Sequence, residues 1–156
     1  MKKIQNPWTI LDGYNCFACS PANEIGIKME FFEEGEELIC KWEPSKHYEG
    51  FTNVLHGGIQ ATLLDEMGAW VVARKLQTVG FTSTLTIKYH KTVVINQPYI
   101  YIKAKLTEVK RNLAFIEAHI YNYEEQLCAS AEMCYFCTSQ EAASSSFHFN
   151  GCSLEE

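Results

Sequence analysis

The stretch from Phe51 to Trp70, FTNVLHGGIQATLLDEMGAW, constrains the fold of this chain more than any other. Its apolar residues do not keep to one stripe, and a helix that is apolar on most sides is a buried one. The pattern predicts one long helix from about residue 57 to residue 77. Asp65 and Glu66 lie in the middle of it, so two carboxylates occupy an element that the rest of the chain must cover.

Segments with the alternating pattern of strands surround this helix. Two short segments at about 26–32 and 37–43 predict a hairpin, and four long segments after Gly80 predict an antiparallel meander. We therefore expect an α+β domain in which an antiparallel sheet of about six strands wraps round one long central helix. A second copy of the chain would close the sheet edge and the remaining face of the helix.

The chain of 156 residues has the size of one domain. We expect a single domain over residues 1–138, with a loop or short helix over 1–24, and a flexible Ser-rich tail over 139–156. The net charge of −6 argues against nonspecific binding to nucleic acid or to anionic membranes. The first residues do not resemble a secretory signal, so we expect a cytoplasmic protein, and the apolar runs are too short to predict a transmembrane helix.

The seven cysteines are odd in number and irregularly spaced, which predicts reduced, mostly buried thiols. Cys16 with Cys19, and Cys134 with Cys137, form two Cys-x-x-Cys pairs that would have to converge to make a four-thiolate zinc site. The second pair lies in a predicted strand, where residues three apart point to opposite faces. We therefore expect no metal, and a zinc-stabilised interaction module stays open as an alternative.

The start of the helix, His56-Gly57-Gly58, carries backbone N–H groups that have no partner within the helix. Such a terminus favours negative charge, so it could stabilise an oxyanion, or its glycines could merely permit a tight turn. Asp65 has no Lys or Arg at positions 61, 62, 68 or 69. We expect it to face a cleft or a subunit boundary, where it could act as a general base or a nucleophile. The alternative, a solvated side chain, suits Glu66 better.

One distance bears on the assembly. Gly57 and Asp65 are eight residues apart, or ~12 Å along a helix, so one carbonyl group cannot contact both. If both act on one substrate, they come from different helices. Two antiparallel copies across a two-fold axis would bring each Gly57 near the other copy's Asp65. The hypothesis is a homodimer with two shared sites, and a further pairing into a homotetramer stays open.

The helix resembles the signature of the hotdog-fold thioesterase superfamily, in particular its PaaI-like acyl-CoA thioesterases. The resemblance rests on HGG at 56–58, on ATLLDEMG at 61–68, on the strand order and on Phe17-Ala18-Cys19 and Ile25-Gly26-Ile27. It covers roughly residues 14–138. It implies hydrolysis of an acyl-CoA or related acyl thioester without a cofactor. A noncatalytic acyl-CoA-binding protein is the alternative.

The resemblance also implies roles for single residues. Asp65 falls at the position of the family's catalytic carboxylate, and Gly57 at that of the backbone amide that polarises the thioester carbonyl. His56 falls at the position of a histidine that orients the loop or the substrate. Thr82 lies near the position of a hydroxyl that holds the attacking water. Independently of the resemblance, Lys and Arg residues cluster in the strand region, Lys88 and Arg111 among them. They are either ordinary solvated charges or a binding site for the phosphates of coenzyme A, with Arg111 as the bidentate partner. Contacts with the substrate are expected from a larger set, namely Gly58, Asn53, Glu66, Ser83, Thr84, Lys88 and Arg111.

Overall fold

The computed structural model describes residues 1–156 and is built round one helix, α1 (Gly57–Val71). The helix continues through a π-helical turn, η2 (Val72–Leu76), and ends at Gln77, whose φ of 53° lies in the left-handed region. The prediction of one helix over about 57–77 is confirmed, with the last turn widened. Most of the buried side chains of α1 are apolar, as the pattern indicates: Leu63, Leu64, Met67, Trp70 and Val71.

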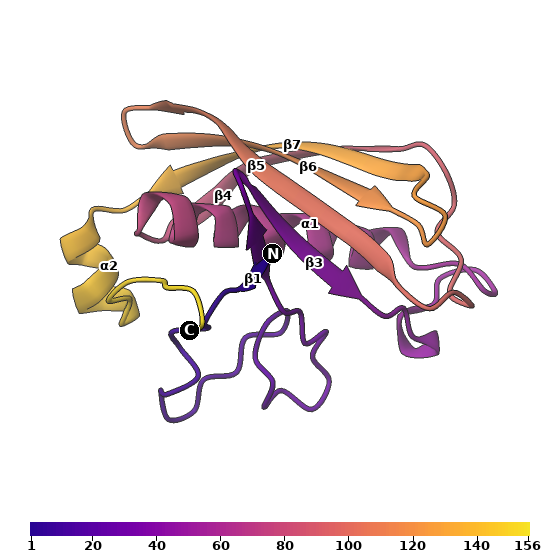
Figure 1. The fold of residues 1–156 in the computed structure, drawn as a ribbon, viewed down its shortest axis with the longest axis horizontal. Helices are drawn as coiled ribbons and strands as arrows, with labels where there is room; N and C mark the ends of the chain where they lie inside the picture. The colour runs from indigo at the N-terminus through magenta and orange to yellow at the C-terminus, as the bar shows by residue number, and fades with distance from the viewer.

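A seven-stranded antiparallel sheet covers one side of α1 (Figure 1). Its strands lie in the order β1-β2-β3-β5-β6-β7-β4. The prediction of about six strands round a central helix is confirmed, and the additional strand is the two-residue β1. The strand bounds are β1 (Lys2–Lys3), β2 (Phe32–Glu34), β3 (Glu37–Trp42), β4 (Gly80–Tyr89), β5 (Ile100–Lys110), β6 (Leu113–Tyr121) and β7 (Leu127–Cys137).

The predicted meander of four strands is wrong in one connection. β4 pairs with β7 along its length and does not neighbour β5, so only β5, β6 and β7 form a meander. The segment 90–99 is too long for a tight hairpin turn. It passes beside the residues that precede α1, where the Leu55 N–H donates to the Val93 carbonyl at 2.8 Å. This crossing moves β4 to the far edge of the sheet.

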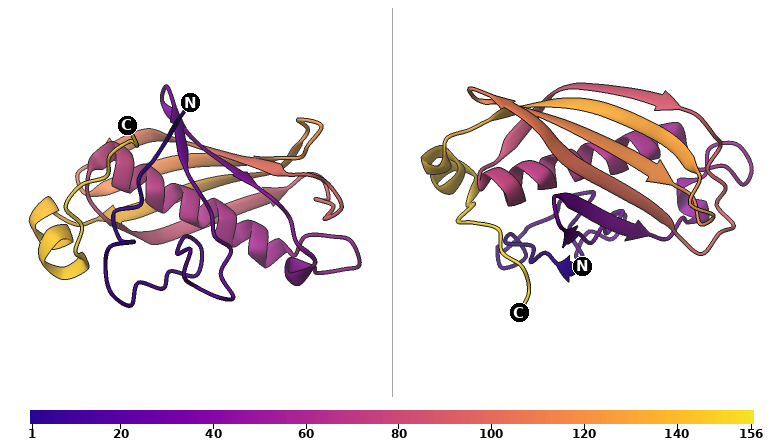
Figure 2. Two further views of the ribbon diagram at one scale, coloured as in Figure 1. Left: turned by 60° about the horizontal axis from the view of Figure 1, so that its bottom comes forward. Right: turned by 45° about the horizontal axis from the view of Figure 1, so that its top comes forward.

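The first hairpin begins later than the alternation indicates. The predicted strand over 26–32 is reduced to β2, and two of its residues bond to the N-terminal segment instead. The Ile27 N–H donates to the Phe17 carbonyl at 2.9 Å, and the Met29 N–H donates to the Ala18 carbonyl at 2.8 Å. These bonds hold the N-terminal segment, which lies on the side of α1 away from the sheet (Figure 2, left).

β4 is an edge strand with one side unpaired within the chain. Its residues Phe81–Thr84 are all exposed, and Phe81 and Tyr89 keep about half of their surface, 52% and 53%. A long exposed edge is a template for pairing with another strand, and natural proteins cover or interrupt such edges. Half-exposed aromatic rings on this edge favour a protein partner.

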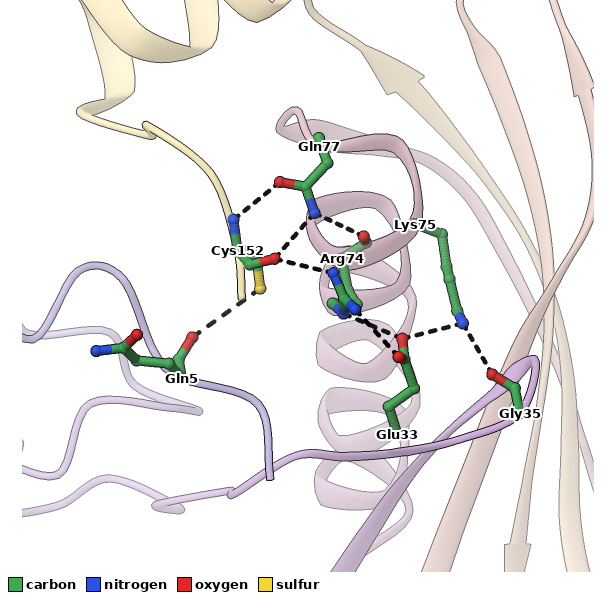
Figure 3. Close-up of polar contacts among 7 residues, drawn as sticks. All are labelled: Gln5, Glu33, Gly35, Arg74, Lys75, Gln77 and Cys152. Atoms are coloured by element: carbon green, nitrogen blue, oxygen red, sulfur yellow. Dashed lines mark hydrogen bonds and ion pairs between the residues drawn. The ribbon is translucent and has the colours of Figure 1, made fainter. Parts of the chain in front are cut away.

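The C-terminal segment packs against the domain, in contrast to the predicted flexible tail. Ser139 caps helix α2 (Gln140–Phe147), and Phe149 and Cys152 are buried. Figure 3 shows how the backbone of Cys152 is held: its carbonyl accepts from Arg74 at 3.1 Å and from Gln77 at 2.9 Å. The Ser-rich composition suggested mobility, but two apolar side chains and these polar contacts fix the segment.

The cysteine prediction is confirmed, because all seven thiols are free and four of them, Cys19, Cys40, Cys128 and Cys152, are buried. In addition, none of the helices has the length and apolar character that crossing a bilayer requires.

Candidate functional site

Asp65 lies half-buried on α1 between two hydroxyl groups of the sheet. The Thr82 hydroxyl on β4 donates to Asp65 Oδ1 at 2.7 Å. The Tyr135 hydroxyl on β7 approaches the same oxygen at 2.8 Å and the Asp65 carbonyl at 2.6 Å. Both side-chain contacts fall on Oδ1, so Oδ2 has no donor within the chain. The carboxylate is thus held in one orientation with one oxygen free to meet a water molecule or a substrate.

Tyr135 is fully buried, and this burial together with the charge of Asp65 raises the pKa of its hydroxyl above the ordinary value of 10.0. The hydroxyl therefore stays protonated and can always donate. The ring packs directly on α1 at Gly68, where any Cβ would overlap the hydroxyl. Gly68 is thus the residue that lets Tyr135 reach Asp65.

A β-bulge lies beside this contact. Thr82 pairs with Tyr135 and Thr84 pairs with Cys134, so Ser83 is the extra residue on β4. Bulges re-aim side chains and are common next to active sites. Thr82 faces α1 as a result, whereas Thr84 faces the outer side of the sheet, away from Asp65.

The start of α1 is organised by His56. Its Nδ1 accepts the Gly58 N–H at 2.8 Å and caps the helix. The neutral ring must then carry its proton on Nε2. The Gly57 N–H, in contrast, donates to no acceptor in the chain. Of the two glycine amides, only that of Gly57 is free to bind a carbonyl oxygen.

Tyr89 fixes the position of Gly57 from the other end of β4. Its hydroxyl donates to the Gly57 carbonyl at 2.7 Å, and its ring lies 3.6–3.7 Å from where a Cβ of Gly57 would be. An open hollow of about 460 Å³ adjoins this point. It is lined by Glu49, Gly50, Phe51, Val54, Leu55, His56 and Gly57.

Sequence reasoning did not identify Tyr89 or Tyr135 as residues that support the site. Both stand in alternation with apolar residues that face α1, Tyr89 after Leu85 and Ile87, and Tyr135 after Met133. The alternation therefore contained the signal for their inward side. Nothing in the sequence indicated that their hydroxyls reach the start of α1 and Asp65.

Five of the predicted substrate contacts lie apart from this site, and Thr84, on the outer side of the sheet, is one of them. Asn53 instead joins the loop before α1 to the segment 90–99. Its side chain donates to Asn96 Oδ1 at 3.1 Å and accepts the Asn96 N–H at 3.2 Å. Lys88 pairs with Ser130 on the outer face of the sheet, and Arg111 lies in the β5–β6 turn at the opposite end of the sheet. Within one chain these two cations therefore do not form one phosphate site.

Glu66 is the fifth, and its side chain has partners within the chain instead of the predicted solvation. Residues next to each other on a helix point ~100° apart. Glu66 accordingly turns to the N-terminal segment, where its Oε1 accepts from Trp70 Nε1 at 3.0 Å and from the Cys16 thiol at 3.6 Å. Burial raises the pKa of its carboxyl to about 7.

Cys16 and Cys19 meet Glu66 with their sulfur atoms 2.9 Å apart. The hydrogen bond from Cys19 lowers the pKa of the Cys16 thiol, and the same contact together with burial raises the pKa of Cys19. The second pair does not join this cluster. Cys134 and Cys137 lie on opposite faces of β7, so the alternative of a four-thiolate zinc site is wrong.

Comparison with known proteins bears on both fold and family. The family model of the thioesterase superfamily matches residues 52–129, half of the chain. No curated protein gives a significant match. Among solved structures, that of a thioesterase superfamily protein has a TM-score of 0.71 at 21% identity. The alignment covers 78% of this chain and 62% of that one, so this chain spans less than two thirds of that relative.

Two further structures are similar over most of their own length. A hypothetical thioesterase of Streptococcus pneumoniae TIGR4, solved with coenzyme A, has a TM-score of 0.66 at 22% identity, covering 72% of this chain and 90% of that one. A Streptococcus mutans UA159 protein bound to acetyl-CoA has a TM-score of 0.64 at 19% identity, covering 71% and 89%. The three likenesses confirm the predicted hotdog fold. By this fold and by the family match, the chain belongs to the thioesterase superfamily.

Proposed function

We propose that the protein hydrolyses an acyl-CoA thioester, with Asp65 as the catalytic carboxylate. The observation that carries the proposal is the geometry of Asp65: Oδ1 is fixed by Thr82 and Tyr135, and Oδ2 has no donor in the chain. A half-buried carboxylate without a cationic partner is costly. Such an arrangement is typical of a side chain kept for chemistry rather than for stability.

The second element of the proposal is the Gly57 amide. Its N–H has no acceptor in the chain and points from the positive end of α1, where a developing oxyanion is favoured. The two groups are ~12 Å apart in one helix, so a single chain cannot apply both to one carbonyl. The proposal therefore includes a homodimer in which each site combines Asp65 of one chain with Gly57 of the other.

The exposed edge of β4 supports this dimer. Thr82, which holds Asp65, lies near one end of β4, and Tyr89, which holds Gly57, lies at the other. Antiparallel pairing of two β4 strands about a two-fold axis would set the Thr82 end of each strand against the Tyr89 end of the other. Asp65 and the partner's Gly57 would then flank one substrate.

The chemistry follows from these positions. The carbonyl oxygen accepts the Gly57 N–H and becomes the oxyanion of a tetrahedral intermediate. Asp65 Oδ2 takes a proton from the attacking water, or attacks the carbonyl carbon itself and forms an anhydride that water then cleaves. In either route the carbon–sulfur bond breaks, and coenzyme A leaves as a thiolate that takes up a proton.

Coenzyme A is proposed as the leaving group because two similar structures contain it. The S. pneumoniae thioesterase was solved with coenzyme A and the S. mutans protein with acetyl-CoA. The test is steady-state hydrolysis of a panel of acyl-CoA thioesters by the wild type and by Asp65→Asn. The proposal expects turnover by the wild type and its loss in the variant, with affinity for coenzyme A retained. Binding without turnover in both proteins would instead identify a noncatalytic acyl-CoA-binding protein.

A further inference from the structure

A second cluster of reactive side chains lies on the face of α1 that carries Glu66, ~100° round the helix axis from Asp65. Cys16 Sγ is 2.9 Å from Cys19 Sγ and 3.6 Å from Glu66 Oε1, and the three ligand atoms all lie within 4.8 Å of one another. It is the only group of three or more potential metal-ligating side chains in the chain that converges in this way. Two of its members come from a loop and the third from α1.

Glu66 has polar partners but no positively charged one within ion-pair distance. The carboxylate makes no ion pair, and its donors are Trp70 Nε1 and the Cys16 thiol. Cys19 is buried, and Cys16 and Glu66 are half-buried. A partly buried carboxylate beside two sulfur atoms is unfavourable unless a bound proton or a cation neutralises its negative charge. A metal ion would satisfy all three side chains at once.

The loop has the backbone geometry that stabilises a thiolate ligand. The Cys19 N–H points at Cys16 Sγ at 3.3 Å, and the Tyr14 hydroxyl lies 2.9 Å from Cys19 Sγ. Two sulfur atoms and one carboxylate oxygen suit Zn²⁺, which binds both donor types and prefers four ligands. Tetrahedral zinc separates its sulfur ligands by about 3.8 Å, so the pair must open by about 0.9 Å. Rotation about the side-chain bonds allows such a change.

We propose that Cys16, Cys19 and Glu66 bind one Zn²⁺ ion, with a water molecule as the fourth ligand at the half-exposed side of Cys16. The ion would have a structural role. The segment 12–25 contains no helix or strand, and the zinc would fasten it to α1 one residue away from Asp65. The proposal does not depend on thioester hydrolysis, and it concerns a mixed site rather than four thiolates.

The experiment measures zinc in the full chain, purified under reducing conditions without added metal and again after incubation with Zn²⁺ and removal of the excess. We expect about one zinc per chain, and Co²⁺ in its place should give the intense visible bands of tetrahedral cobalt with sulfur ligands. Cys16→Ser and Glu66→Gln should each weaken zinc binding by at least about tenfold. The matched control is Cys134→Ser, from the other Cys-x-x-Cys pair, which should bind like the wild type.

A second measurement keeps the test decisive if the variants fold poorly. A chelator added to the wild type should remove the zinc and increase amide hydrogen exchange in the segment 12–30, and re-added Zn²⁺ should reverse the change. The proposal is overturned if the folded wild type takes up no zinc or cobalt. It is also overturned if Cys16→Ser retains full affinity, or if Cys16 and Cys19 are joined as a disulfide under the reducing conditions.

Discussion

Gly57→Pro offers a direct way to remove one of the proposed catalytic groups while keeping the fold. Gly57 is the first residue of α1, a position at which proline is well tolerated because its missing N–H has no helical partner. His56, the preceding residue, has φ −56° and ψ 133°, which is the extended conformation that a following proline requires. The substitution therefore deletes the one free amide and breaks no hydrogen bond of the helix.

The expected effect on turnover is large. Loss of one oxyanion donor costs on the order of 10²–10³ in kcat, or ~2.7–4 kcal/mol. No neighbouring group can replace the lost amide, because the Gly58 N–H is bound by His56 at 2.8 Å. The expected change in the free energy of unfolding is small, within ~1 kcal/mol, since no packed contact is lost.

The assay compares acyl-CoA hydrolysis and urea unfolding for the wild type, Gly57→Pro and Gly57→Ala. Alanine is the matched control: it keeps the N–H, and its Cβ would lie 3.6 Å from the Tyr89 hydroxyl, an ordinary contact. We expect Gly57→Ala to remain close to wild-type activity. Wild-type turnover by a folded Gly57→Pro protein, or an equal loss in Gly57→Ala, would refute the role of the amide.

Three further predictions concern the support of the site and the assembly. Tyr135→Phe should destabilise the protein by about 1–2 kcal/mol and lower the melting temperature by roughly 2–8 °C, because a buried hydrogen bond to Asp65 is lost. It should also reduce kcat more than it changes KM, because the hydroxyl holds Asp65 without lying in the reaction path. Tyr123→Phe is the control, and equal behaviour of the two variants would contradict this role. Burial alone would raise the pKa of Glu33, but its contacts with Lys75 and Arg74 lower that pKa below its ordinary value of 4.5 (Figure 3). Glu33→Gln removes these ion pairs and should therefore lower the free energy of unfolding near pH 7. The difference from the wild type should vanish as the pH falls through the lowered pKa, and a difference that persists at pH 2 would be the opposing result. Finally, a 1:1 mixture of Asp65→Asn and Gly57→Pro chains, refolded together, should recover about a quarter of wild-type activity, because half the dimers would contain one intact shared site. Complete inactivity of the mixture would mean that the sites are not shared.

The elements with strong sequence periodicity were predictable. The helix over 57–77 and the strands after Gly80 follow from apolar patterns that tertiary contacts only reinforce. The position of β4 was not predictable, because it depends on where the segment 90–99 crosses the domain, and no local pattern encodes that path. The prediction of a flexible C-terminal tail failed for a related reason. The burial of two side chains, Phe149 and Cys152, fixes the segment although its composition is mostly polar.

The candidate site was predictable in part. Asp65, Gly57, His56 and Thr82 were singled out by their residue types and by the family resemblance, and the structure places Thr82 on Asp65 and His56 on the amide next to Gly57. Their roles in catalysis stay predictions. Tyr135 could not be found, because its contact with Asp65 joins residues 70 positions apart and requires the space left at Gly68.

The most direct measurement is the rate of the chemical step with the enzyme in excess over a bound acyl-CoA, for the wild type and for Asp65→Asn. Under these single-turnover conditions product release does not contribute. A carboxylate that activates water or attacks the carbonyl should give a variant slower by about 10²–10⁴-fold, with affinity for coenzyme A unchanged. Cleavage of the thioester by Asp65→Asn at the wild-type rate would contradict the account.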